Sequence, residues 1–402
     1  MQKPFVSALA AALLVSLVAC EDSVAPQPRL TAARGAAADV TAVDDADEPD
    51  DPAGVDHRFS DNDVRFSFVV IGCNRVDKAD TAAARPSTAN IAELHRAYAE
   101  IAQMRPLPRF VFFAGDMVFG YAQNANDTLA LMRELPAWMA IWQESPAAVA
   151  GVEMVPLEGN HEVQTKAKIA FPAAERVWLR EMGPYITHAG NGPGAGGPDN
   201  LATDQSRLTY SFDYGRTHFV LVNTDPYGKD GSAPVEWMKG DLAAATRNHA
   251  KHIFVISHKP AYAYPISRYA PPGLPAEDGI GGTYPAERDA LWAAFADAHV
   301  EAMLSAHNHL YYRTQGWTGA TWQIIAGNGG SPIEPLLSPY KEEQSYFGYS
   351  VVTVHRNNRV TLTSYAHHIG ASYLSGSPEN PTLVFDQADI TWPLPGNRFG
   401  TY

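Results

Sequence analysis

Five segments of this 402-residue chain place polar side chains directly after an apolar run typical of a β-strand. They are Cys73-Asn74-Arg75, Gly115-Asp116, Gly159-Asn160-His161-Glu162, His258 and His307-Asn308-His309. In open α/β sheets the carboxyl ends of strands line the ligand crevice, so we expect these side chains at one edge. Carboxylate, amide oxygen and imidazole that converge on one point form a metal site, and this donor set suits Zn, Mn or Fe. Taken singly, Asp116 could cap a helix and His258 could be a core histidine.

The chain between these segments alternates strand and helix patterns. Strands are predicted at 64–72, 109–114, 152–157, 252–257, 300–305, 321–326, 350–355 and 360–365, with a hairpin over 208–222. Helices are predicted from Ser87 to Ile101 and over 127–142, 234–247 and 285–298. Strand–helix alternation followed by a strand-rich end predicts an α/β protein with mixed sheets.

Four of the five polar segments resemble, in content and in order, motif blocks of the calcineurin-like metallophosphoesterases. The match covers roughly residues 64–368, and its blocks are Gly115-Asp116, Gly159-Asn160-His161-Glu162, His258 and Ala306-His307-Asn308-His309. The run from His307 to Arg313 is similar to the His-x-His-x-Tyr-x-Arg segment of the purple-acid-phosphatase branch. The resemblance implies a four-layer α/β/β/α sandwich of two mixed sheets.

The resemblance also implies a centre of two metal ions, with a role for each matching residue. The implied protein ligands are Asp116, Asn160, His258, His307 and His309. Asp116 would bridge both metals, His309 would belong to the second metal, and His161 would bind or protonate the substrate. Two metals about 3.5–4 Å apart would hold a hydroxide that attacks the phosphoryl group. Other histidines, among them His252 and His367, are expected at the surface.

The first block departs from the family pattern, which has an aspartate two residues before a histidine. This chain has Cys73-Asn74-Arg75 there, and three interpretations stay open. Cys73 could bind a metal as a thiolate. Alternatively only one metal binds and the Arg75 guanidinium replaces the charge of the other and grips phosphate, or Cys73 is a plain buried cysteine in a degraded centre. The branch's tyrosine position is Phe119 and the nearest tyrosine is Tyr121, so no tyrosinate–iron chromophore is expected.

The first 62 residues predict export rather than a folded domain. Lys3, a short apolar stretch and Leu17-Val18-Ala19-Cys20 resemble a bacterial lipoprotein signal over residues 1–20, with lipid on Cys20. Ordinary secretion is the alternative. Residues 21–62 hold three basic and eleven acidic residues, which predicts a disordered acidic linker. Residues 63–402 are then one catalytic domain, anchored to a membrane and facing the periplasm or the cell exterior.

The net charge and the cysteine count exclude some classes of protein. The chain has 30 basic and 44 acidic residues, and its net charge of -14 argues against a nucleic-acid partner. Two cysteines cannot build a disulfide framework. We expect an exported, metal-dependent phosphoric ester hydrolase that acts on small phosphate monoesters. The alternatives are a phosphodiesterase or nucleotidase of the same fold, and a non-catalytic surface binding protein that retains a metal.

Overall fold

The computed structural model describes residues 63–77, 90–121, 124, 127–264, 279–315, 320–332, 346–368 and 381–392. These residues all fall within one compact unit, Asp51–Tyr402. The predicted signal segment and the predicted acidic linker lie outside the described residues. The described residues contain two six-stranded sheets.

The first sheet has the strand order β12-β11-β10-β1-β2-β3. Its strands are β1 (Val64–Ile71), β2 (Phe110–Ala114), β3 (Glu153–Leu157), β10 (Tyr346–His355), β11 (Val360–His368) and β12 (Leu383–Asp389). β1, β2 and β3 run parallel, and β10 is antiparallel to β1. β2 reads Phe-Val-Phe-Phe-Ala and is buried throughout, as expected of a parallel strand covered on both faces. The parallel strands β1, β2 and β3 therefore end at the same edge.

The second sheet has the strand order β4-β5-β6-β7-β9-β8. Its strands are β4 (Tyr210–Tyr214), β5 (Thr217–Val222), β6 (His252–Ser257), β7 (Ala302–Ser305), β8 (Tyr311–Gln315) and β9 (Trp322–Ala326). β5, β6, β7 and β9 are parallel, while β4 and β8 pair antiparallel at the two edges. The predicted hairpin is β4–β5, and its turn residue Gly215 has a positive φ of 57°. Here too the parallel strands deliver their carboxyl ends to one edge.

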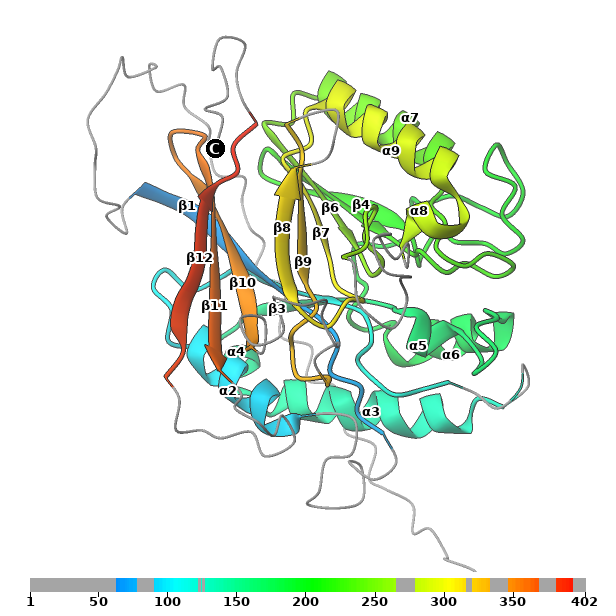
Figure 1. Cartoon of the computed structure of the whole chain (residues 1–402), viewed down its shortest axis with the longest axis horizontal. Helices are drawn as coiled ribbons and strands as arrows, with labels where there is room; N and C mark the ends of the chain where they lie inside the picture. The colour runs from blue at the N-terminus through cyan, green and yellow to red at the C-terminus, as the bar shows by residue number, and fades with distance from the viewer. Residues whose placement is uncertain are drawn as a thin grey trace, which may run out of the picture. The chain divides into compact units, whose positions relative to one another are not determined.

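Helices cover the outer face of each sheet, as Figure 1 shows. They are α2 (Ile91–Ile101), α3 (Leu129–Gln143), α4 (Pro146–Val149), α5 (Asn160–Val163), α6 (Pro172–Glu181), α7 (Val235–Arg247), α8 (Ile280–Thr283) and α9 (Pro285–Ala298). α2 and α3 pack on the first sheet, where Trp138 meets Phe113 edge-on with ring centroids 4.7 Å apart. α7 and α9 pack on the second sheet through Met238 and Trp292.

A phenylalanine-rich core fills the space between the two sheets. Phe68 of β1 lies edge-on to Phe219 of β5 and Phe254 of β6, with ring centroids 5.2 and 5.1 Å apart. Such edge-to-face pairs add to the free energy gained from apolar burial. Helices, sheet, sheet and helices thus form four layers, and the predicted α/β/β/α sandwich of two mixed sheets is confirmed.

Candidate metal centre

The site lies where the carboxyl ends of β1, β2, β3, β6 and β7 meet, and tight turns bring the chain together there. Gly115 directly follows β2 and has a φ of 82°. A side chain at this position would put its Cβ 2.5 Å from His258 Nδ1 and 2.7 Å from the Cα of Gly159. Only glycine permits this approach, because it has no Cβ and tolerates a positive φ. The Gly-Asp pair therefore places Asp116 directly beside the third and fourth polar segments.

Several residues at these turns have a left-handed backbone conformation. Residues other than glycine rarely adopt a left-handed conformation, and each instance costs free energy that the surrounding structure must offset. Positive φ angles of 42–65° occur at Cys73, Arg75, Asp116, Tyr121 and His307. Strain of this kind is typical of functional sites, where it holds side chains in one geometry.

Four donor atoms from four segments converge on one point. His258 Nε2 lies 3.1 Å from Asp116 Oδ1 and 2.9 Å from Asn160 Oδ1. His307 Nδ1 lies 3.0 Å from the same Asn160 oxygen and 3.1 Å from His258 Nε2. His258 Nδ1 faces the Ala114 carbonyl at 2.8 Å, so Nδ1 carries the hydrogen and the Nε2 lone pair points inward. One carboxylate oxygen, one amide oxygen and two imidazole nitrogens fit a Zn, Mn or Fe ion.

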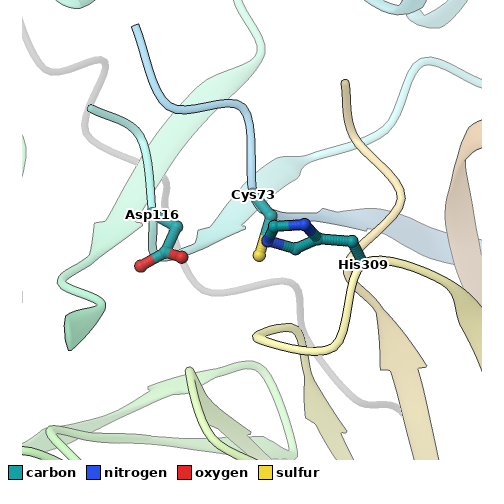
Figure 2. Close-up of side chains that lie close together, drawn as sticks. All are labelled: Cys73, Asp116 and His309. Atoms are coloured by element: carbon teal, nitrogen blue, oxygen red, sulfur yellow. The ribbon is translucent and has the colours of Figure 1, made fainter. Parts of the chain in front are cut away.

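A second group of donors shares Asp116. The Cys73 thiol, the Asp116 carboxylate and the His309 imidazole have ligand atoms within 4.8 Å of one another, and all three side chains are buried. Figure 2 shows that they come from the turns after β1, β2 and β7. His309 Nδ1 faces the Pro332 carbonyl at 2.7 Å, which assigns the lone pair to Nε2. Sulfur, oxygen and nitrogen in this arrangement also fit Zn or Fe.

Arg75 contacts the same carboxylate. Its Nε and Nη2 lie 3.2 and 3.1 Å from Asp116 Oδ2, whereas Oδ1 faces His258. Burial alone would raise the pKa of Asp116, but His161, His258 and Arg75 together hold it well below its usual value. Burial also raises the pKa of the Cys73 thiol well above its usual value, and the Asp116 charge adds to this shift. Cys73 and Arg75 thus both lie next to Asp116, so the structure is compatible with Cys73 as a metal ligand and with Arg75 as a substitute for the charge of a metal.

His161 lies beside these donors and is held on both sides of its ring. Its Nδ1 is 2.6 Å from the Phe119 carbonyl, and its Nε2 is 3.8 Å from Asp116 Oδ2. The ring lies over Tyr121 with centroids 3.8 Å apart. Burial and then the positive charge of Arg75 lower the pKa of His161 to about 3. His161 is therefore neutral at pH 7, with hydrogen on Nδ1 and the Nε2 lone pair toward the centre.

Glu162 and the ion pair of Lys259 with Asp225 brace the site, and neither was predicted from the sequence. Glu162 accepts backbone hydrogen bonds from Asp116 at 3.0 Å, Val118 at 2.9 Å and Gly159 at 2.7 Å. Behind His258, the Nζ of Lys259 lies 2.7 Å from Oδ1 of Asp225, which is buried in the segment that follows β5. Glu162 follows Asn160-His161 in the third segment, and Lys259 follows His258. Their position next to predicted ligands was the signal in the sequence, but Asp116, Val118 and Asp225, which they contact, are distant in sequence.

Two histidines expected at the surface are buried instead. His252 Nδ1 lies 2.8 Å from Glu301, and His367 Nε2 lies 3.0 Å from Glu93. Both expectations were wrong for the same reason. His252 of β6 meets the buried carboxylate of Glu301, just before β7, and His367 of β11 meets that of Glu93 on α2, and a buried imidazole with such a partner is satisfied.

No family model matches the chain. A protein named "Probable inactive purple acid phosphatase 9", from Arabidopsis thaliana, is 25% identical over 191 residues, which cover 41% of this chain and 28% of that protein. Among solved structures, purple acid phosphatase PPD1 from yellow lupin (Lupinus luteus) seeds is 16% identical, with a TM-score of 0.54 over 80% of this chain and 53% of that chain. PhoD is 14% identical, with a TM-score of 0.51 over 82% of this chain and 71% of that chain.

These likenesses establish the fold. The chain has the fold of the calcineurin-like metallophosphoesterases, as its motif order predicted. It spans less than two thirds of the Arabidopsis and lupin proteins. Among the described residues, none of the helices combines the length and the apolar character needed to cross a membrane.

Proposed function

We propose that this protein is a metal-dependent hydrolase of phosphate monoesters. The observation that carries the proposal is the convergence of Asp116, Asn160, His258 and His307 on one point, with His161 at its side. Those side chains would hold one metal ion, and Cys73 with His309 and the second oxygen of Asp116 would hold another. A bound metal would supply Lewis-acid stabilisation of phosphoryl charge and lower the pKa of a water.

The residues of the chain have separate parts in this chemistry. The Arg75 guanidinium has a planar pair of donors that suits a phosphoryl oxygen. His161 is the candidate general acid, because its Nδ1 is bonded to the Phe119 carbonyl and only Nε2 can exchange a proton with a leaving-group oxygen. A phosphate dianion next to Nε2 favours the protonated ring and raises the low pKa of His161.

The test is hydrolysis of 4-nitrophenyl phosphate by protein stripped with a chelator and reloaded with Zn²⁺, Mn²⁺ or Fe²⁺. We expect metal-dependent turnover that Asp116→Ala abolishes and His161→Ala lowers about 100-fold or more, since general acid catalysis is worth that much. His95→Ala is the matched control, because His95 is exposed on α2. Wild-type rates in folded Asp116→Ala and His161→Ala would refute the proposal.

Monoester preference is the finer part of the proposal, and it rests on the similarity of the fifth segment to the purple-acid-phosphatase branch. A phosphodiesterase or nucleotidase of the same fold is the alternative. Parallel assays with bis(4-nitrophenyl) phosphate and with a nucleoside 5′-monophosphate separate these substrate classes. A higher kcat/KM for the diester than for the monoester would replace the monoester assignment.

A second candidate function is retention of one metal without catalysis. Two observations favour it. The Arg75 guanidinium contacts Asp116 Oδ2, at the carboxylate that the second donor group shares. One relative also carries the word "inactive" in its name. This candidate predicts one bound metal, an intact fold and no hydrolysis of any of the three esters, so the same assays decide between the two functions.

We also propose that the chain is exported and held at a membrane by lipid on Cys20. The proposal rests on the residues from Lys3 to Cys20, which have the basic start, apolar stretch and terminal cysteine of a lipoprotein signal. Expression in a bacterial host with labelled palmitate should give a labelled, membrane-bound protein. Cys20→Ser should remove the label. Cys73→Ser is the matched cysteine control and should keep it.

A further inference from the structure

Tyr121 contacts both a candidate ligand and the candidate general acid. Its phenol oxygen accepts a hydrogen bond from Asn160 Nδ2, and its ring lies 3.8 Å from that of His161, centroid to centroid. Its backbone N–H donates to the His161 carbonyl at 3.1 Å. The residue before it, Gly120, has a φ of 52°, and a Cβ there would meet the His161 oxygen at 1.9 Å. The chain is thus shaped to bring Tyr121 against the third segment.

The phenol determines which way the Asn160 amide faces. An amide presents a carbonyl oxygen on one side and two N–H donors on the other. Because Nδ2 donates to Tyr121, Oδ1 must face His258 Nε2 and His307 Nδ1, at 2.9 and 3.0 Å. A reversed amide would aim N–H groups at the metal position, where they cannot act as ligands. Hydrogen-bonding partners that orient metal ligands typically contribute 10- to 100-fold in metal affinity.

The ring of Tyr121 has a different effect. His161 is held in its plane by the Phe119 carbonyl at Nδ1, and the Tyr121 ring covers one face of the imidazole. Phe119 and Tyr121 both come from the segment that follows Asp116. The segment after the shared carboxylate therefore orients the Nε2 of His161 as well as the oxygen of Asn160.

We propose that Tyr121 is a positioning residue that fixes the Asn160 amide through its hydroxyl and the His161 imidazole through its ring. This inference rests on the proposed function. It assigns the two tasks to different parts of one side chain, so two substitutions separate them. Tyr121→Phe removes the hydroxyl and keeps the ring, while Tyr121→Leu removes both.

The first measurement is Zn²⁺ affinity of chelator-stripped full-length protein, by calorimetric titration without substrate. We expect Tyr121→Phe to weaken Zn²⁺ binding at the Asp116–Asn160–His258–His307 site about 10-fold or more. The matched control is Tyr185→Phe, which removes another phenol that accepts an amide hydrogen bond, here from Gln143. This control should bind Zn²⁺ like the wild type.

The second measurement is kcat at saturating Zn²⁺ on aryl phosphates whose leaving groups differ in pKa. Poor leaving groups depend most on a well-placed general acid. Tyr121→Leu should therefore lose about 10-fold more kcat on the poorest leaving group than Tyr121→Phe, a dependence that general loosening of the fold would not produce.

The outcomes are distinguishable. An unchanged Zn²⁺ affinity in Tyr121→Phe overturns the role of the hydroxyl, and equal leaving-group dependence in the two variants overturns the role of the ring. A wild-type protein that binds no metal and hydrolyses no ester overturns the proposed function and this inference together. Circular dichroism of each variant establishes that it is folded, and Tyr121→Phe alone tests the hydroxyl if Tyr121→Leu does not fold.

Discussion

Arg75 grips one oxygen of Asp116 with two nitrogens, Nε at 3.2 Å and Nη2 at 3.1 Å from Oδ2. The other oxygen of the carboxylate faces His258 at 3.1 Å. The two oxygens of Asp116 are therefore divided between the four-donor group and the guanidinium. Asp116 also belongs to the group with Cys73 and His309. Cys73, His309 and Oδ2 would hold a second metal directly beside the guanidinium, so we expect the metal and Arg75 to compete for Oδ2.

The first prediction follows from this competition. Removing Arg75 eliminates a positive charge next to the second donor group and releases Asp116 Oδ2 as a ligand. Arg75→Ala should therefore bind the second Zn²⁺ about 10-fold more tightly, since about 1.4 kcal/mol of charge repulsion corresponds to that factor. Calorimetric titration of stripped protein measures it. Arg109→Ala is the control, because Arg109 forms a comparable ion pair with Glu153 at 2.7 Å. Equal or weaker second-site affinity would contradict the competition.

The second prediction concerns the rate in the same variant. If Arg75 moves from Asp116 to the phosphoryl oxygens, its removal eliminates a charge-assisted contact that strengthens as charge develops. We expect kcat/KM of Arg75→Ala on 4-nitrophenyl phosphate to fall about 100-fold, at saturating metal. Arg75→Lys should recover only part of this loss, because an ammonium lacks the planar pair of donors. A rate equal to that of Arg109→Ala would mean that Arg75 only balances the charge of Asp116.

The third prediction tests Cys73 as a ligand. In a Cys20→Ser background, Cys73 is the remaining cysteine of the chain. Cys73→Ser should lower the metal content from about two ions to about one, because a hydroxyl is a poor substitute for a thiolate on Zn. Cys73→Asp should keep about two, because a carboxylate is again a good ligand. Elemental mass spectrometry measures the ratio of metal ions to protein molecules. An unchanged metal content in Cys73→Ser would mean that Cys73 of the wild type is a buried cysteine and not a metal ligand.

The fourth prediction concerns the carboxylate that joins the second and third segments. Glu162 accepts three backbone N–H groups, two of them on Oε2. In Glu162→Gln one oxygen becomes an NH₂ group, which faces a backbone donor. Each unsatisfied buried donor costs about 1–3 kcal/mol, so the free energy of unfolding should fall by about 3 kcal/mol. Urea unfolding measures this, with the exposed Glu144→Gln as control. If the free energy of unfolding changed as little as in the control, the three hydrogen bonds to Glu162 would not be needed for stability.

The fold and the candidate ligands could be predicted from the sequence more completely than the contacts that support those ligands. Strands and ligand segments are local signals, so β6 (His252–Ser257) and α9 (Pro285–Ala298) were predicted with the bounds that the structure has. α6 (Pro172–Glu181), β8 (Tyr311–Gln315) and β12 (Leu383–Asp389) were not predicted. β8 and β12 are edge strands whose residues are largely outside the core, so their apolar pattern is weak.

The contacts of the site depend on distant pairs that a single sequence does not reveal. Nothing local links Arg75 to Asp116, or Tyr121 to Asn160, because each pair meets only when the turns after different strands approach. The same holds for the pairing of His367 with Glu93, which buries a histidine expected in solvent. The residue types indicated which side chains could bind a metal. Which residue each of these side chains contacts is determined by the fold and was visible only in the structure.

The last prediction concerns pH and lies away from the metal centre. His218 of β5 places Nδ1 2.7 Å from Asp213 and Nε2 3.0 Å from Asp241. Burial lowers its pKa, but the hydrogen bonds and charges of Asp241 and Asp213 outweigh burial and raise the pKa above its ordinary value. A pKa raised in the folded state means that the charged form stabilises the fold. This contribution is fully present below the unfolded pKa of about 6.5 and is lost as pH rises through the folded pKa.

The corresponding experiment compares the wild type with His218→Gln by urea unfolding at several pH values between about 6 and about 9, a range that spans the titration of a histidine with a raised pKa. The wild type should be more stable than the variant at the acidic end, and this advantage should shrink as pH rises. His95→Gln is the control, because His95 is exposed on α2. An advantage that stays constant or grows with pH would mean that His218 is folded as the neutral imidazole, and that Asp213 and Asp241 do not hold its second proton.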